Sequence, residues 1–115
     1  MKVYPPLNLS DQVNNFGLNP YGVGVENLQV LATRGYAVLL PDAPMRGMKG
    51  IAETVLPGVA RTVELGIADP DRLGVMGHSN GGYGTLALIV QTKRFKAAID
   101  NASPVSKSSS GCRRK

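Results

Sequence analysis

The sequence contains no tryptophan, a single cysteine (Cys112) and a single histidine (His78). One cysteine excludes an internal disulfide and any metal site that is built from several cysteines. Aromatic residues make up only 5% of the 115 residues, whereas 43% are hydrophobic, so the core is expected to be aliphatic. A chain of this length corresponds to one small domain or to part of a larger one.

Long hydrophobic runs are also missing from the sequence. No segment approaches the roughly 20 apolar residues that a membrane-spanning helix needs. The first six residues, MKVYPP, do not begin the apolar run of a signal peptide. We therefore expect a cytoplasmic protein that has no membrane partner.

Acidic residues are absent from the last nine positions, although these positions carry four of the 13 basic residues. Without these four, nine basic residues face eight acidic ones, so the body of the chain is close to neutral. Residues 105–115 are rich in serine and basic residues and are predicted to form a disordered tail. Because the positive charge is confined to this tail, we do not expect a nucleic-acid partner.

Patterns typical of strands and helices alternate along the rest of the chain. Strands are expected at residues 2–4, 36–40, 73–76 and 97–99, and helices at residues 26–34, 51–65 and 81–91. This alternation predicts an α/β fold with a parallel sheet of about four strands and helices on both faces. The strand at 36–40 is a continuous apolar run, so it is expected to be buried on both faces.

The most informative motif is Gly77-His78-Ser79-Asn80-Gly81, which lies between an expected strand and an expected helix. The Gly-x-Ser-x-Gly spacing in this position is typical of the nucleophile elbow of serine hydrolases, in which a strained turn exposes the serine hydroxyl. Gly77 and Gly81 flank the serine where a Cβ atom would crowd the turn. The backbone N–H of Asn80 is the expected first donor of an oxyanion hole.

The base that would activate Ser79 is missing from the expected place. A serine hydroxyl becomes a nucleophile when a base takes its proton, and this base is usually a histidine held by a carboxylate. In hydrolases with this elbow, the acid and the histidine follow the serine along the chain. His78 precedes the serine, so it is expected to pack or hydrogen-bond beneath the turn instead. Asp100, at the end of the last strand, is an alternative triad acid, although a solvent-exposed aspartate is the simpler interpretation.

No metal and no cofactor are expected. Residues 22–24, Gly-Val-Gly, are similar to the start of a dinucleotide-binding fingerprint. They do not follow a strand, however, and no third glycine stands at the required spacing. The sequence therefore offers no cofactor motif beside the candidate serine.

Two segments of the chain carry a resemblance to a known family. Residues 31–42 (LATRGYAVLLPD) and 66–83 (GIADPDRLGVMGHSNGGY) are similar to the corresponding segments of prolyl oligopeptidase-type serine peptidases. The resemblance extends over about residues 3–102. It implies an α/β-hydrolase catalytic domain that acts on peptides or esters.

The resemblance also implies roles for two further residues. Gly82 belongs to the Gly-Gly pair that closes the elbow, and the Tyr4 hydroxyl is the second oxyanion donor. The chain departs from the family after Tyr4, because Pro5 and Pro6 stand where glycines are usual.

The resemblance covers less than half of such a catalytic domain, which implies that residues 1–104 form a partial domain. The acid and the histidine of the family lie later in the domain and have no counterpart in this chain. The expected function is that of a serine peptidase fragment that carries Ser79 but is inactive alone. The alternative is a truncated, inactive product that acts, if at all, by association, and exposed sheet edges are its expected route of self-association.

Overall fold

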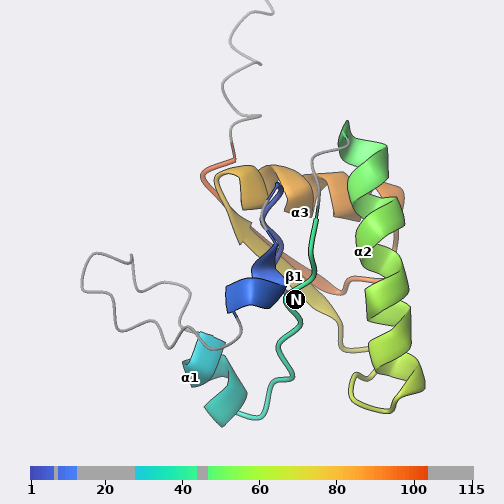
Figure 1. Ribbon diagram of the computed structural model, residues 1–115. Coiled ribbons are helices and arrows are strands. Elements are labelled where there is room, and N and C mark those ends of the chain that lie inside the picture. The colour runs from blue at the N-terminus through green and yellow to red at the C-terminus, as the bar shows by residue number, and fades with distance from the viewer. Residues whose placement is uncertain (7, 13–27, 44–46, 104–115) are drawn as a thin grey trace, which may run out of the picture.

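The computed structural model describes residues 1–6, 8–12, 28–43 and 47–103. In chain order the elements are the 3-10 helix η1 (Leu9–Gln12), helices α1 (Leu28–Thr33) and α2 (Gly47–Glu64), strand β1 (Gly74–His78), helix α3 (Asn80–Gln91) and strand β2 (Ala97–Asn101) (Figure 1). The alternation of helices and strands is therefore the α/β pattern that the sequence predicts. The expected tail at residues 105–115 and the Gly-Val-Gly segment at residues 22–24 lie outside the described residues.

Strands β1 and β2 form a parallel pair in which Gly74 lies opposite Ala97 and His78 lies opposite Asn101. Helix α3 connects the two strands, so residues 74–101 form one strand–helix–strand unit. The sheet of the described residues has two strands, where about four were expected.

The other two expected strands are irregular segments that lie beside β1. Lys2 forms one isolated parallel bridge with Met76, and its N–H donates to the Leu39 carbonyl at 3.1 Å. The first segment cannot extend this pairing, because Pro5 and Pro6 follow it and have no N–H to donate to a ladder. The hydrogen bonds nevertheless fix the order across the structure as Leu39, Lys2, β1 and β2.

The segment at residues 36–40 is also less buried than the sequence suggested. Tyr36 is 66% exposed, and none of the five residues is fully buried. A strand is buried on both faces only where covering elements and flanking strands surround it. The expectation of a doubly buried strand was therefore wrong for the described structure. On one side of the segment, Lys2 N–H donates a single hydrogen bond to the Leu39 carbonyl.

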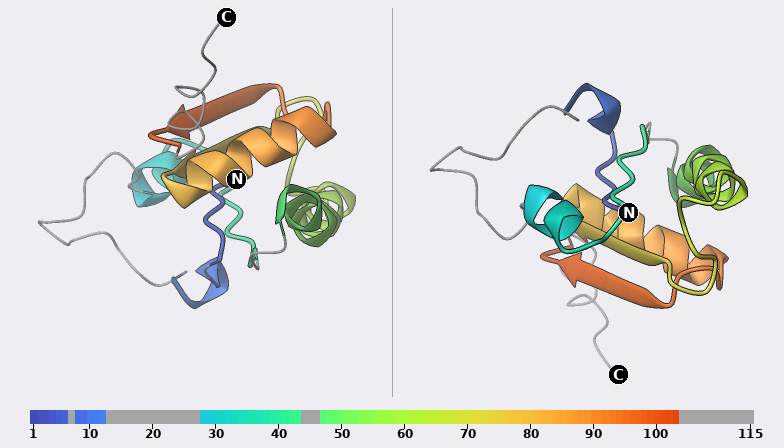
Figure 2. Two further views of the ribbon diagram at one scale, coloured as in Figure 1. Left: turned by 90° about the horizontal axis from the view of Figure 1, so that it is seen from above. Right: turned by 90° about the horizontal axis from the view of Figure 1, so that it is seen from below.

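The core lies between α2, α3 and β1. Helix α2 buries Ile51, Val55 and Val59, which recur every four residues and form one stripe. The stripe packs in a single cluster with Val75 of β1 and Leu88 of α3. Helix α3 lies on one side of β1, and α1 lies on the opposite side (Figures 1 and 2). Neither α2 nor any other described helix has the length and apolarity to cross a membrane.

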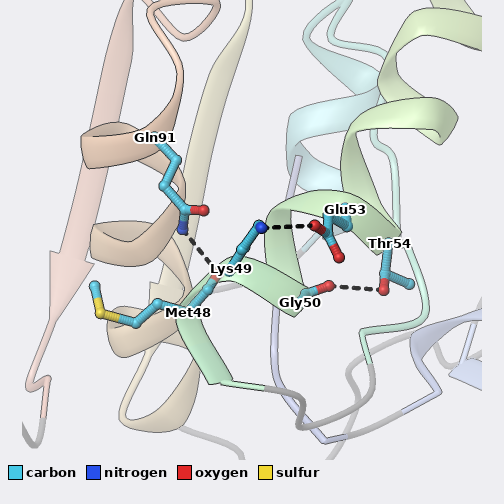
Figure 3. A network of polar contacts seen from close by, with 6 residues as sticks. All are labelled: Met48, Lys49, Gly50, Glu53, Thr54 and Gln91. Atoms are coloured by element: carbon cyan, nitrogen blue, oxygen red, sulfur yellow. Dashed lines mark hydrogen bonds and ion pairs between the residues drawn. The ribbon is translucent and has the colours of Figure 1, made fainter.

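Figure 3 shows how the end of α3 is fastened to the start of α2. Gln91 Nε2 donates to the carbonyl oxygens of Met48 and Ala87, in both cases at 2.7 Å. Within α2, Lys49 and Glu53 form an ion pair at 3.8 Å, but both side chains are mostly exposed, so the pair adds little stability. Gln91 thus holds α3 in place from its C-terminal end, while its N-terminal end forms the candidate site.

Candidate active site

The centre of the site is the turn between β1 and α3, which consists of Ser79. Its backbone has φ 55° and ψ −114°, a conformation that costs a residue with a side chain on the order of 1–3 kcal/mol. Two hydrogen bonds hold the turn: Ser79 N–H donates to the Asn101 carbonyl at 2.9 Å, and Tyr83 N–H donates to the Ser79 carbonyl at 3.1 Å. The turn is therefore strained, and both β2 and α3 fix it.

The hydroxyl of Ser79 is not used to cap the helix. A serine that directly precedes a helix normally accepts a hydrogen bond from an N–H group of the first turn. Ser79 makes no such side-chain bond, and its side chain has no other hydrogen bond within the described residues. The residue is half-buried. Its hydroxyl thus remains available at the point where the N–H groups of α3 begin.

The glycines on either side of Ser79 are required by close packing. A Cβ atom on Gly77 would overlap the carbonyl group of Gly81. A Cβ atom on Gly81 would overlap the Val3 carbonyl oxygen and would stand 3.3 Å from Cδ2 of Tyr4. Backbone atoms cannot move aside as a flexible side chain can. The first turn of α3 therefore packs directly on the end of β1 and on the segment that carries Tyr4.

Gly82 is required for a different reason, which sequence reasoning could not find. A Cβ atom on Gly82 would overlap Oδ1 of Asp100 and would stand 3.2 Å from Cα of Ser103. Asp100 thus directs its carboxylate against the first turn of α3. The residue itself is exposed, as the simpler sequence interpretation held, and it makes no hydrogen bond within the described residues.

Tyr4 lies beside the turn, at the carboxyl end of the segment that flanks β1. It is half-buried, and its ring packs against Gly81, two residues after Ser79. Pro5, which follows it, is buried and lies against α3. A Cβ atom on Gly84 of this helix would stand only 3.0 Å from Cδ of Pro5. The structure therefore brings Tyr4, Ser79 and Asn80 to one end of β1.

The sequence predicted that His78 packs or hydrogen-bonds beneath the turn, and this prediction was wrong. The residue is exposed, and no hydrogen bond joins it to Ser79 in the described structure. The reason is the alternation of side chains along β1, which has Val75 and Gly77 buried while Met76 and His78 lie on the other face. Helix α3 covers the first face only, so His78 remains in solvent.

Asp42, which lies two residues after the segment at 36–40, binds Ser10 through its carboxylate. Its carboxylate accepts hydrogen bonds from Ser10 N–H at 3.0 Å and from Ser10 Oγ at 2.9 Å. It therefore holds η1 in place. Among the residues that the structure describes, no group of three or more histidine, cysteine, aspartate or glutamate side chains is arranged to hold a metal ion.

Comparison with known protein families gives a match to the candidate site. The model of the prolyl oligopeptidase family matches residues 49–112, which is more than half of the chain. The matched region includes most of α2 and all of β1, the Ser79 turn, α3 and β2. A search of curated proteins and a search of solved structures returned no match.

Proposed function

Because the chain belongs to the prolyl oligopeptidase family, we propose that it contributes the nucleophile, Ser79, to a serine-type peptidase reaction. Its substrates would be peptides, or esters that react in the same way. In this proposal residues 1–104 are part of an α/β-hydrolase catalytic domain, and residues 105–115 are a tail outside that domain.

The observation that carries the proposal is the backbone of Ser79. Its positive φ is unfavourable for a serine, and its hydroxyl gains no capping hydrogen bond in return. Strain of this kind persists where the surrounding structure enforces it, and it concentrates at functional sites. A nucleophilic serine needs the hydroxyl that this turn leaves free.

The proposed reaction is an acyl transfer. Ser79 Oγ forms a bond to the carbonyl carbon of the substrate, the electron pair of the C=O bond moves onto its oxygen, and a base takes the hydroxyl proton. When the carbonyl forms again, the bond to the leaving amine or alcohol breaks, and the leaving group receives that proton. The product is an ester of Ser79, which water then hydrolyses.

The negatively charged oxygen would be held by the N–H of Asn80 and the hydroxyl of Tyr4. Asn80 is the first residue of α3, where N–H groups have no partner within the helix and the helix dipole favours negative charge. The packing of the Tyr4 ring against Gly81 supports its role, because it brings the residue to the same turn. Only the backbone of Asn80 matters for this function.

We further propose that the histidine base and its carboxylate come from outside these 115 residues. The only histidine, His78, is exposed and is not bonded to Ser79. The isolated chain would then have almost no peptidase activity. The second candidate function is that of an inactive product that acts by association, and the free edge of β2 discussed below favours it.

Chemical rescue can test the role of Ser79 without the missing base. Free imidazole can accept the serine proton, so a fluorophosphonate reagent should label Ser79 at a rate that rises with imidazole concentration. Peptide mass spectrometry identifies the labelled residue. Ser79→Ala should abolish this labelling, and His78→Ala should leave it unchanged.

Ser10, an exposed serine outside the turn, provides the internal control in an Asp42→Ala background, which removes the carboxylate to which its hydroxyl donates. Preferential labelling of Ser79 over Ser10 supports the proposal. Equal labelling of the two serines, or labelling that Ser79→Ala does not affect, would show that the turn does not activate its hydroxyl.

A further inference from the structure

Strand β2 has one free edge in the described structure. It pairs with β1 on one side, and no described strand pairs with its other side. All five residues, Ala97–Asn101, are exposed. Figure 2 shows β2 at the outer border of the fold, beyond α3. An exposed edge of this kind can template pairing with another strand.

The hydrogen bonds of the neighbouring strand identify which groups face outward. In a parallel pair the residues of each strand alternate between facing the partner and facing away. Ser79 N–H donates to the Asn101 carbonyl, so residues 97, 99 and 101 face β1 through their backbone groups. The N–H and C=O groups of Ala98 and Asp100 therefore point to the free edge.

We propose that this edge binds the same edge of a second copy of the chain. A two-fold axis brings two identical strands together in antiparallel orientation. If the axis passes midway between the two copies of Ile99, Ala98 of each copy lies opposite Asp100 of the other. The outward N–H and C=O groups of both residues are then all paired, in four hydrogen bonds. This inference does not depend on the catalytic role of Ser79.

The side chains of β2 suit this self-pairing. Ile99 is 62% exposed, and in this register it meets its own counterpart in a closely spaced pair. Lys96 is exposed and directly precedes the strand. It lies diagonally across from Asp100 of the second copy, within reach of a long side chain. The pairing therefore places Lys96 of each copy diagonally across from Asp100 of the other, although the two copies of Asp100 also lie diagonally across from each other.

The strength of the contact should be modest, because two five-residue strands form a small interface compared with the roughly 1,200 Å² of stable complexes. We expect a dimer that forms as the protein concentration increases. Sedimentation velocity over a wide concentration range measures it. A chain that remains monomeric throughout would overturn the proposal.

Cysteine cross-linking tests the register directly, in a Cys112→Ser background. Ile99→Cys should form an intermolecular disulfide, because closely spaced antiparallel pairs have Cα atoms about 4.5 Å apart. Ala97→Cys is the matched control on the same strand. Its two copies would be separated by four residue steps, or roughly 14 Å, so it should not cross-link. Equal cross-linking of both variants, or none at position 99, would contradict the pairing.

Charge reversal tests the same pairing without a covalent bond. Lys96→Glu alone and Asp100→Lys alone should each weaken dimerisation by roughly threefold to tenfold, because each places like charges across the interface. A mixture of the two variants restores both opposite-charge pairs, so it should form a mixed dimer of at least the original affinity. Failure of the mixture to associate more strongly than either variant alone would overturn the proposal.

Discussion

The carboxylate of Asp100 occupies the space that a Cβ atom on Gly82 would fill. This contact joins the end of β2 to the first turn of α3, one turn beyond the strained serine. It explains why position 82 requires a glycine, through a residue that lies 18 positions later in the chain.

Gly82→Ala should lower the free energy of unfolding by about 1–3 kcal/mol, as expected of a side chain forced into occupied space. Part of this loss should disappear in an Asp100→Gly background, where only Ser103 still opposes the new Cβ atom. Urea unfolding of the four proteins gives the coupling between the two positions. Gly58→Ala is the control, since nothing lies within 4 Å of a Cβ atom there. That variant should gain about 0.5–1 kcal/mol from its higher helix propensity.

Gly77→Ala should lower the free energy of unfolding by more than about 3 kcal/mol, and thus by more than Gly82→Ala does. The reason is that its Cβ atom meets the backbone of Gly81. No rotation of a side chain can relieve that overlap. Gly74→Ala on the same strand is the matched control, with its nearest neighbour at 3.7 Å, an ordinary contact. Similar unfolding free energies for the two variants would contradict the close approach of α3 to β1.

Ser79→Gly should be more stable than Ser79→Ala by about 1 kcal/mol, because glycine adopts φ 55° without a steric penalty. Both variants lose the hydroxyl, so their difference isolates the backbone term. Thermal or urea unfolding provides the comparison. Equal stability of the two would mean that the turn stores no strain.

Gln91→Glu should weaken the attachment of α3 to α2, since a carboxylate cannot donate to the carbonyl oxygens of Met48 and Ala87. The loss of the two bonds should cost about 1–2 kcal/mol at neutral pH. Below the pKa of the new carboxyl, its proton restores one donor, so the deficit relative to the parent should shrink as the pH falls. Gln91→Leu serves as the control, because its deficit should not change with pH.

The turn at Ser79 could be predicted from the sequence because its requirements are local. A strand, a Gly-x-Ser-x-Gly motif and a helix follow one another within residues 74–91, and the observed β1, Ser79 turn and α3 occupy those positions. The stripe of α2 at Ile51, Val55 and Val59 is equally local, since a helix brings every fourth residue to one side. The start of α2 at Gly47 was less predictable, because residues 47–50 (GMKG) do not continue the apolar period of the helix.

Only the tertiary structure decided which partners these elements meet. The sequence could not indicate that Gly82 faces Asp100, or that Ser79 N–H reaches Asn101, because both contacts depend on the register of β1 against β2. The prediction that His78 lies beneath the turn was wrong for the same reason. The direction of its side chain depends on which face of β1 is covered by α3, and His78 lies on the face that α3 leaves uncovered. The number of strands depended on backbone hydrogen bonds between distant segments, which Pro5 and Pro6 limit after Lys2. The sequence by itself thus determined the succession of strand, turn and helix around Ser79 through its local spacing, whereas long-range packing decided what surrounds this segment.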